Sequence, residues 1–253
     1  MAEPSFPAGP PPELVTEDRL GRHVFFQPRQ GYRFSIDSVL LASFATPPGP
    51  ASRGVVVDLG AGAGVLPVLL AARGLAGPFL AVEIDPLAAA CCRANFAAAG
   101  LTGRVLEGDL AQERPELPAG GAALVITNPP FGRPGHGRLP PEPSRARARH
   151  ELALDASALW ARAARLLPRG GRLALAWPAT RLAEALTGLT AAGLTPKRLR
   201  CVHGRATLPA KTVLLEAAKQ GRPGLAVEPP LVVYAGGQEH TPEVQAIYRE
   251  LCG

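Results

Sequence analysis

The feature that most constrains the fold of this chain is a regular alternation, from Gly54 onward, of short apolar runs with longer helical patterns. Strands are expected at 55–57, 79–84, 104–107, 122–127 and 172–177, and helices at 64–73, 86–99, 155–167 and 181–192. Apolar strands that alternate with helices form parallel sheets covered on both faces. The last two strands, at 199–203 and 212–217, have no convincing helix between them and are expected to pair antiparallel. The pattern predicts an α/β fold with a mostly parallel, seven-stranded sheet, helices on both faces and an antiparallel last strand.

The two ends of the chain depart from this pattern. Residues 1–13 are rich in proline and glycine and are expected to form a disordered lead-in. Residues 14–50 are expected to form an appendage, a β-hairpin that turns at Gly21 followed by a short helix with Asp37 as a possible N-cap. The main domain is then 51–253, which closes with a C-terminal flap.

Composition excludes several classes of protein. No apolar run approaches the roughly 18 residues of a membrane span, and the N-terminus lacks the basic start and apolar stretch of a signal peptide. The cysteines include no C-x-x-C pair and are expected to be reduced thiols of a cytoplasmic protein; they are Cys91, Cys92, Cys201 and Cys252. The histidines have no metal-ligand spacing, so no metal is expected. The net charge of +6 attracts polyanions, although composition alone proves no nucleic-acid binding.

A glycine-rich turn follows the first strand of the main domain and opens a helix. Such a turn lets a ligand approach the backbone closely. The dinucleotide-binding fingerprint would need its third glycine at Val65, which disfavours an NAD-dependent oxidoreductase. An acidic residue beside the turn instead suits a ligand that carries a positive charge. The residues expected to contact the ligand here are Asp58, Gly60, Ala61, Gly62 and Gly64.

Acidic residues follow three successive strands of the predicted sheet. Glu83 comes about twenty residues after the glycine turn, where a carboxylate can accept hydrogen bonds from both hydroxyls of a ribose. Asp109 follows the next strand, where it can accept a hydrogen bond from the amino group of an adenine. Because open α/β sheets bind ligands at the carboxyl edge of their strands, Asp58, Glu83 and Asp109 are expected to line one pocket. The flanking candidates for the same pocket are Ile84, Asp85 and Leu110.

The fourth strand runs into the tetrapeptide Asn128-Pro129-Pro130-Phe131. An exocyclic amine on a planar ring is a poor nucleophile because its lone pair is delocalised. The side-chain oxygen of Asn128 and the carbonyl of Pro129 can accept its two N–H groups and orient the nitrogen toward a methyl donor. The prolines rigidify the turn, and Phe131 offers a face for the target base. No set of nucleophile, base and orienter appears, so covalent catalysis is not expected.

Together these motifs resemble those of class I S-adenosylmethionine-dependent methyltransferases, which have a Rossmann-like fold. Within that class the chain resembles, from about Leu20 to Tyr248, the bacterial tRNA1(Val) (adenine-37-N6)-methyltransferase family. The more specific stretches are 30–42, 128–133 and 145–151. The resemblance implies S-adenosylmethionine as cofactor and methyl transfer to the exocyclic N6 of an adenine in RNA, with tRNA as the expected partner.

The resemblance also implies roles outside the motifs named so far. The segment 32–38 would cover the methionine end of the cofactor, with Asp37 close to its amino acid moiety. An arginine-rich run follows the Asn128 tetrapeptide, and its position beside the active site predicts contacts to phosphates. The RNA-binding candidates are Arg133, Arg138, Arg145 and Arg149.

Motif chemistry alone leaves three alternatives. N2-guanine methyltransferases of rRNA and N5-glutamine methyltransferases of release factors also present a planar nitrogen to an Asn-Pro-Pro-aromatic motif. The basic flank favours RNA over a protein glutamine, and the whole-chain resemblance favours adenine over guanine. An RNA-binding module with an inactive methyltransferase fold would be expected to lose the acidic residues or the Asn128 tetrapeptide, and both are intact. The sequence leaves the target RNA, the modified position and the oligomeric state open.

Overall fold

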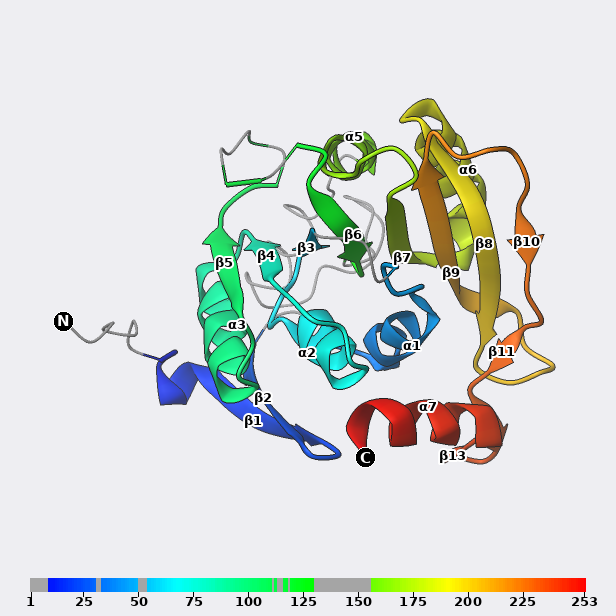
Figure 1. Cartoon of the computed structure of the whole chain (residues 1–253). Coiled ribbons are helices and arrows are strands. Elements are labelled where there is room, and N and C mark those ends of the chain that lie inside the picture. The colour runs from blue at the N-terminus through cyan, green and yellow to red at the C-terminus, as the bar shows by residue number, and fades with distance from the viewer. Residues whose placement is uncertain are drawn as a thin grey trace.

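One large sheet crosses the molecule in the computed structural model, which describes residues 9–30, 33–49, 54–110, 112, 116, 117, 119–129 and 156–253 (Figure 1). Its main strands are β3 (Val55–Leu59), β4 (Phe79–Glu83), β5 (Gly103–Glu107), β6 (Ala122–Thr127), β7 (Arg172–Pro178), β8 (Leu194–His203) and β9 (Ala210–Lys219). They pair in the order β5-β4-β3-β6-β7-β9-β8. The first five of these pair in parallel, whereas β9 is antiparallel to both its neighbours. The predicted fold class is confirmed.

The C-terminal side of the sheet is more extensive than the sequence predicted. The strands β8 and β9 each span 10 residues, and two short strands, β10 (Ala226–Val227) and β11 (Leu231–Val232), pair in parallel with β8. The described residues therefore form a sheet of 9 strands rather than seven. A two-residue strand has no period of its own to detect, and it forms because it satisfies the backbone N–H and C=O groups of an edge strand.

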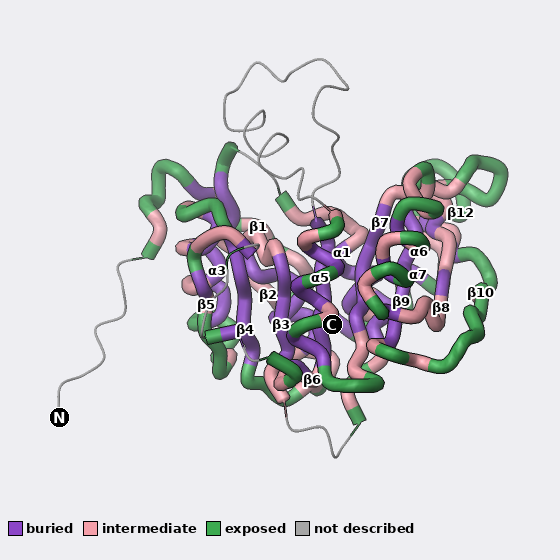
Figure 2. Tube along the Cα trace, turned by 90° about the horizontal axis from the view of Figure 1, so that it is seen from above, coloured by how far each residue is buried: buried purple, intermediate pink, exposed green. Residues whose placement is uncertain are grey.

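Helices cover both faces of the sheet, and each face has its own apolar cluster. One face carries α1 (Ile36–Phe44), α2 (Val65–Ala72), α3 (Pro86–Ala98) and α7 (Pro242–Cys252), and the other carries α5 (Ala156–Leu166) and α6 (Leu182–Ala191), which the short 3-10 helix η2 (Ala179–Arg181) precedes (Figure 1). The central strands between these layers are buried (Figure 2). Trp160 and Trp177, which the sequence pattern placed in the core, are 2% and 4% exposed, with ring centroids 5.0 Å apart.

The N-terminal hairpin meets the C-terminal end of the chain beside this core. The expected hairpin forms from β1 (Val15–Leu20) and β2 (His23–Pro28), after a 3-10 helix, η1 (Pro12–Leu14), whereas residues 1–8 lie outside the described residues. Its turn contacts the end of α7, which follows the small hairpin of β12 (Tyr234–Gly236) and β13 (Glu239–His240). The N–H of Arg22 donates to the Cys252 carbonyl at 2.9 Å. A Cβ on Gly21 would lie 1.9 Å from the same oxygen, so this turn requires glycine.

Helix α1 begins two residues earlier than its expected cap implied. The N-cap is Ser35, whose side-chain oxygen accepts a hydrogen bond from the N–H of Asp37 at 3.2 Å. Asp37 is therefore inside the first turn, and the expectation that it caps the helix is wrong. Both residue types are good caps, and Ser35 takes the position because its backbone is extended while that of Asp37 is helical.

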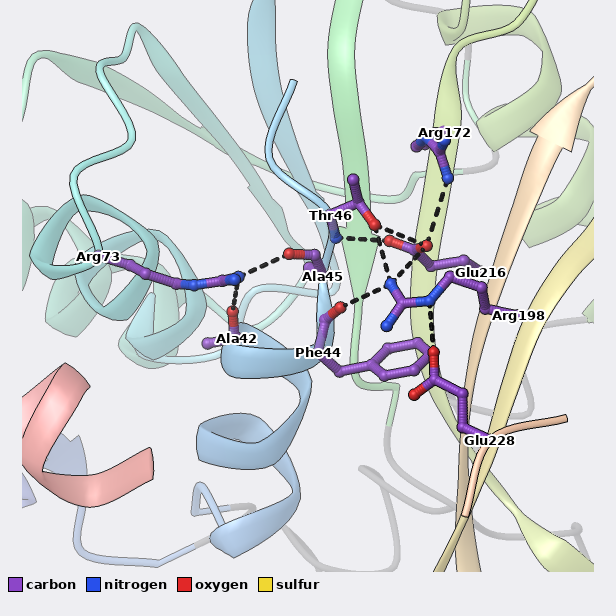
Figure 3. Close-up of polar contacts among 9 residues, drawn as sticks. All are labelled: Ala42, Phe44, Ala45, Thr46, Arg73, Arg172, Arg198, Glu216 and Glu228. Carbon is purple, nitrogen blue, oxygen red and sulfur yellow. Dashed lines mark hydrogen bonds and ion pairs between the residues drawn. The ribbon is translucent and has the colours of Figure 1, made fainter. Parts of the chain in front are cut away.

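The C-terminal end of α1 is held by charged side chains from three other elements (Figure 3). Arg73, which follows α2, donates to the carbonyls of Ala42 and Ala45 at 2.9 and 2.6 Å. The buried carboxylate of Glu216 on β9 accepts from the Thr46 hydroxyl at 2.9 Å and from Arg198 of β8 at 2.9 Å. The helix is thereby attached to the sheet and to α2, because its otherwise unsatisfied last carbonyls have fixed donors.

The described residues contain no helix long and apolar enough to cross a membrane. All four cysteines are free thiols. No group of histidine, cysteine and acidic side chains with the arrangement of a metal site occurs in the described part of the chain.

Candidate active site

The glycine turn connects β3 to α2 in a left-handed backbone conformation at alternate residues. Gly60, Gly62 and Gly64 have φ values of +73°, +54° and +76°. The N–H groups of Gly60 and Ala61 donate to the Val82 carbonyl on β4 at 2.9 and 3.0 Å. Glycine adopts this conformation without strain, and the hydrogen bonds attach the turn to the neighbouring strand.

The glycines of the turn differ in what lies beside them. A Cβ on Gly64 would be 2.5 Å from the Cys92 sulfur, so this residue packs closely against α3. A Cβ on Gly60 or Gly62 would meet no atom within 4 Å. The backbone of the first two glycines therefore faces open space, where a ligand can approach it.

Glu83 lies at the end of β4 and holds the turn from the side. Its side chain accepts a hydrogen bond from the N–H of Gly62 at 2.6 Å and another from the N–H of Asp85 at 2.9 Å. Burial raises the pKa of Glu83, and these two hydrogen bonds counteract part of that rise. A carboxylate has about four lone-pair sites, so Glu83 keeps the capacity to accept from a ligand.

Asp58 lies in β3, two residues before the first glycine of the turn, and is completely buried. Neither of its carboxyl oxygens has a hydrogen-bond partner among the described residues. Burial, and secondarily the charge of Glu83, raise the pKa of Asp58 well above its usual value. The sequence predicted an acid at this edge of the sheet, but not that its side chain is completely buried.

The segment after β5 carries Asp109 and Leu110. It reaches the end of β4 because the N–H of Gly108 donates to the Glu83 carbonyl at 2.7 Å. Arg162 on α5, which is 8% exposed, donates to the Leu110 carbonyl at 2.7 Å. Sequence reasoning missed this arginine, because nothing in a helical pattern shows that one of its charges points inward to hold a loop.

Asn128 follows β6 and is 6% exposed. Its Nδ2 donates to the hydroxyl of Ser38 on α1 at 3.0 Å, while its Oδ1 has no hydrogen-bond partner among the described residues. The preceding residue, Thr127, donates its hydroxyl proton to the Leu59 carbonyl at 2.7 Å. This bond joins the ends of β6 and β3, so Asn128 lies beside the start of the glycine turn.

A pocket opens at this point, between the glycine turn, α1, β2 and the end of β6. Its lining combines the predicted turn and Asn128 with three side chains from the N-terminal segment, Gln27, Phe34 and Ser38. Phe34 and Ser38 belong to the segment 32–38, which is expected to cover the methionine end of the cofactor, whereas residues 31 and 32 lie outside the described residues. Asp37 is half-buried, and its carboxylate accepts from the Ser35 hydroxyl at 3.1 Å.

The hairpin wall of the pocket depends on Asn95 of α3, another residue that sequence reasoning missed. Asn95 accepts from the N–H of Phe26 at 2.7 Å and donates to the Phe26 carbonyl at 2.9 Å. Its Nδ2 also donates to the Ala63 carbonyl in the glycine turn at 2.8 Å. Gln27, next along β2, accepts from the N–H of Phe34 at 3.0 Å. One buried amide therefore aligns the hairpin with the turn.

The remaining predicted site residues fall into two groups. Asp85 caps α3 by accepting from the N–H of Ala88 at 2.8 Å, and Ile84 beside it is 38% exposed. Pro129 is buried. Six further candidates lie outside the described residues: Pro130, Phe131, Arg133, Arg138, Arg145 and Arg149.

Comparison with known proteins identifies the family. A family model described as the methyltransferase small domain matches residues 35–186. The chain belongs to this methyltransferase family. The match covers both the glycine turn and Asn128, and the cofactor of these enzymes is S-adenosylmethionine. The resemblance predicted from the motifs is confirmed.

Curated relatives of this methyltransferase share one name. A protein of Porphyromonas gingivalis named tRNA1(Val) (adenine(37)-N6)-methyltransferase is 35% identical over 187 residues, 71% of this chain and 70% of the relative. A protein of Tolumonas auensis with the same name is 32% identical over 227 residues, 88% of this chain and 91% of the relative.

Solved structures show the same fold. A predicted O-methyltransferase of Agrobacterium tumefaciens has a TM-score of 0.66 at 24% identity and covers 85% of this chain and 96% of its own. M. jannaschii TYW2 in complex with AdoMet has a TM-score of 0.54 at 15% identity and covers 81% of this chain and 85% of its own.

Proposed function

We propose that this methyltransferase transfers the methyl group of S-adenosylmethionine to the exocyclic N6 of an adenine in tRNA. The observation that carries the proposal is Oδ1 of Asn128, a buried acceptor that lines the pocket and has no partner among the described residues. An orphaned acceptor at this depth fits a ligand that brings its own N–H donor. The shared name of the relatives supports adenine as the base and tRNA as the substrate class.

The residues at the carboxyl edge of the sheet fit S-adenosylmethionine. The open space beside Gly60 and Gly62 admits a ligand against the backbone, and Glu83 can accept from ribose hydroxyls. Asp109 is proposed to accept from the adenine of the cofactor. A positive charge bound above the turn would favour the ionised form of Asp58, whose pKa is otherwise high. When bound, S-adenosylmethionine supplies an electrophilic methyl group on a sulfonium.

Asn128 and Pro129 orient the amine that accepts the methyl group. Oδ1 of Asn128 accepts one N–H of the amine and the carbonyl of Pro129 accepts the other, so the nitrogen lone pair points at the methyl carbon. With S-adenosylmethionine bound, the nitrogen held by Asn128 and Pro129 would take the methyl group, the electron pair of the broken carbon–sulfur bond would stay on sulfur, and the nitrogen would then release one proton to solvent. Orientation supplies much of the acceleration, so no strong general base is required.

The decisive experiment incubates the protein with labelled S-adenosylmethionine and total tRNA from a strain that lacks the gene, followed by mass spectrometry of the nucleosides. N6-methyladenosine in tRNA is the expected product. Parallel reactions supply rRNA or a release factor in place of tRNA. Detection of N2-methylguanosine in the rRNA, or of N5-methylglutamine in the release factor, would replace the proposed substrate. Absence of transfer to all three would favour an RNA-binding module with an inactive methyltransferase fold.

The arginine-rich run after the tetrapeptide is proposed to contact RNA phosphates. Replacing Arg145 and Arg149 together by alanine should reduce the slope of log affinity against log salt by roughly one to two units, since each phosphate contact contributes about 0.7 to 0.9. The matched control replaces Arg104 and Arg169, two exposed arginines near the starts of β5 and β7, at the opposite edge of the sheet. An unchanged slope in the first double variant would remove this segment from the RNA interface.

A further inference from the structure

The contact between Asn128 and Ser38 decides which end of the Asn128 amide faces the pocket. Both side chains are buried, at 6% and 5% exposure, and both line the pocket. The hydroxyl oxygen of Ser38 accepts from Nδ2 of Asn128 at 3.0 Å, which leaves Oδ1 as the end without a protein partner among the described residues. The two ends of an amide have nearly the same shape but opposite hydrogen-bonding character, and because the Ser38 hydroxyl, which can donate or accept, is the acceptor here, the contact turns Oδ1 toward the pocket.

The direction of this amide matters for the chemistry. An exocyclic amine offers N–H donors, so it binds the carbonyl end of Asn128 and is repelled by the NH₂ end. With the amide turned over, two donors would face each other and the nitrogen would lose its orientation toward the methyl group. The productive arrangement therefore needs an acceptor on the side of Asn128 that faces away from the substrate.

Ser38 is held where it can be this acceptor. It lies in the first turn of α1, whose N-terminus is capped by Ser35. The other end of the same helix is bound by Arg73, Arg198 and Glu216 (Figure 3). Just before α1, the N–H of Phe34 donates to Gln27 of β2 at 3.0 Å, so the helix is attached to other elements at both ends and the Ser38 hydroxyl is in a defined position.

We propose that Ser38 is a positioning residue that selects the productive orientation of the Asn128 amide. The inference rests on the proposed function, because it concerns the group that holds the target amine. In a Ser38→Ala variant, the productive orientation would bury an unpartnered NH₂ group against a methyl group. The amide would then turn over and expose its NH₂ end to the pocket, because a buried donor without a partner is unfavourable.

The orientation can be measured without any activity. The chain contains two asparagines, Asn95 and Asn128, so ¹⁵N labelling of asparagine alone gives two side-chain NH₂ groups in an NMR spectrum. Ser38→Ala should shift the Asn128 pair and speed its proton exchange, while the Asn95 pair stays unchanged as an internal control. The matched variant Ser43→Ala, about 7.5 Å further along α1, should change neither pair. Unchanged Asn128 signals in Ser38→Ala would overturn the proposal.

Kinetics then test whether the orientation matters for methyl transfer. Ser38→Ala should lower the single-turnover rate about tenfold or more, the cost of leaving one buried donor unpaired. An Asn128→Asp background provides the sharpest control, since a carboxylate presents an acceptor oxygen in either orientation. There the same Ser38→Ala change should cost less than about threefold, because an orientation-independent acceptor uncouples the two positions. Equal losses in both backgrounds would show that Ser38 acts through something other than the amide.

Failure of the proposed function is distinguishable from failure of this inference. If the wild-type protein methylates guanine or glutamine in place of adenine, the same rates are measured with that substrate, because its planar nitrogen also offers N–H donors. If the wild-type protein transfers no methyl group, the proposed function is wrong, whereas the NMR shifts still decide whether Ser38 orients Asn128. Cofactor affinity, measured by calorimetry, should differ by less than about twofold between Ser38→Ala and Ser43→Ala, since neither change removes a charged acceptor.

Discussion

Asp58 and Glu216 are both completely buried acids in strands of one sheet, yet they differ in the hydrogen-bond donors around them. Glu216 accepts hydrogen bonds from the backbone and hydroxyl of Thr46 and from Arg198, and it also contacts Arg172 at 3.4 Å. Neither oxygen of Asp58 has a partner among the described residues. A buried carboxylate with several donors holds elements together, whereas one without donors destabilises the fold when it is ionised and is neutralised instead by a raised pKa.

Oδ1 of Asn128 belongs with Asp58 in this comparison. Both are buried and unpartnered within the described part of the chain, and both lie at the carboxyl edge close to the glycine turn. The cluster around Glu216 lies instead at the far end of α1 (Figure 3). The contrast predicts two kinds of effect. Substitutions of side chains with unpartnered atoms should change activity or binding, and substitutions of side chains with paired atoms should change the free energy of unfolding.

The largest expected effect is at Asn128. Asn128→Ala should lower the rate of methyl transfer roughly 100- to 1000-fold, as removal of one preorganised hydrogen-bonding group at a reacting centre does elsewhere. The free energy of unfolding should fall by no more than about 1 kcal/mol, because Oδ1 has no partner to lose among the described residues and only the hydrogen bond from Nδ2 to Ser38 is removed. Single-turnover kinetics and urea unfolding measure the two quantities. Near wild-type turnover in a folded variant would contradict the proposed mechanism.

The next effect is on stability, at Glu216. Glu216→Gln should lower the free energy of unfolding by about 2 to 3 kcal/mol, because Arg198 and Arg172 lose a buried charged acceptor. The matched control is Glu228→Gln, which alters a half-buried partner of the same Arg198 and should cost less than about 1 kcal/mol. Equal costs in the two variants would mean that burial does not distinguish these ion pairs. Calorimetry on the folded variants should show unchanged cofactor affinity.

Glu83 sharpens the comparison because it is paired with the turn and is also proposed to bind the cofactor. Glu83→Ala should weaken cofactor binding by roughly 1.5 to 3 kcal/mol, the usual loss of a charged acceptor. Because the N–H of Gly62 would also lose its acceptor, the free energy of unfolding should fall as well. A folded variant with unchanged cofactor affinity in calorimetry would leave Glu83 with a purely structural role.

An effect of opposite sign is expected at Asp58. Its raised pKa means that the native state keeps a proton that the unfolded chain has already released, so the free energy of unfolding falls as pH rises through the window between the two pKa values. Asp58→Asn should remove this loss, and each unit of raised pKa corresponds to about 1.4 kcal/mol at higher pH.

Urea unfolding of the cofactor-free protein from pH 4 to 8 tests this sign. The difference between Asp58→Asn and wild type should grow with pH and favour the variant, while cofactor affinity of the variant falls. A variant less stable than wild type at every pH would place Asp58 with Glu216, as a residue that holds the fold.

Much of the candidate site could be predicted from the sequence, because its residues follow strands directly. Parallel strands bring their carboxyl ends to one edge, so a residue after one strand is near the residues after its neighbours. Asp58, Glu83 and Asn128 could be grouped on this basis alone. The complete burial of Asp58 could not be predicted. A residue inside a strand and a residue at its exposed end can be only one position apart in the sequence.

The partners of these residues were decided by the tertiary structure. Ser38 meets Asn128 across 90 positions of sequence, and Asn95 meets Phe26 across 69. Neither contact has a spacing rule, since each depends on how a helix packs on a sheet. The cap of α1 shows the same limit at short range, because Ser35 and Asp37 are both good N-caps and only the backbone conformation selects one.

The amino-acid sequence by itself therefore determined the order of strands and helices, the glycine turn and the acceptor that follows β6, because period and turn chemistry are local properties of a chain. The tertiary structure alone decided which buried polar atoms have partners. Glu216 and Asp58 are both single acids within apolar strand patterns, and nothing local distinguishes them. The end of α1, with Thr46, comes to Glu216, while none of the described residues brings a donor to Asp58. Whether a buried carboxylate has hydrogen-bond donors depends on which residues, distant in the sequence, pack against it. That is a property of the fold.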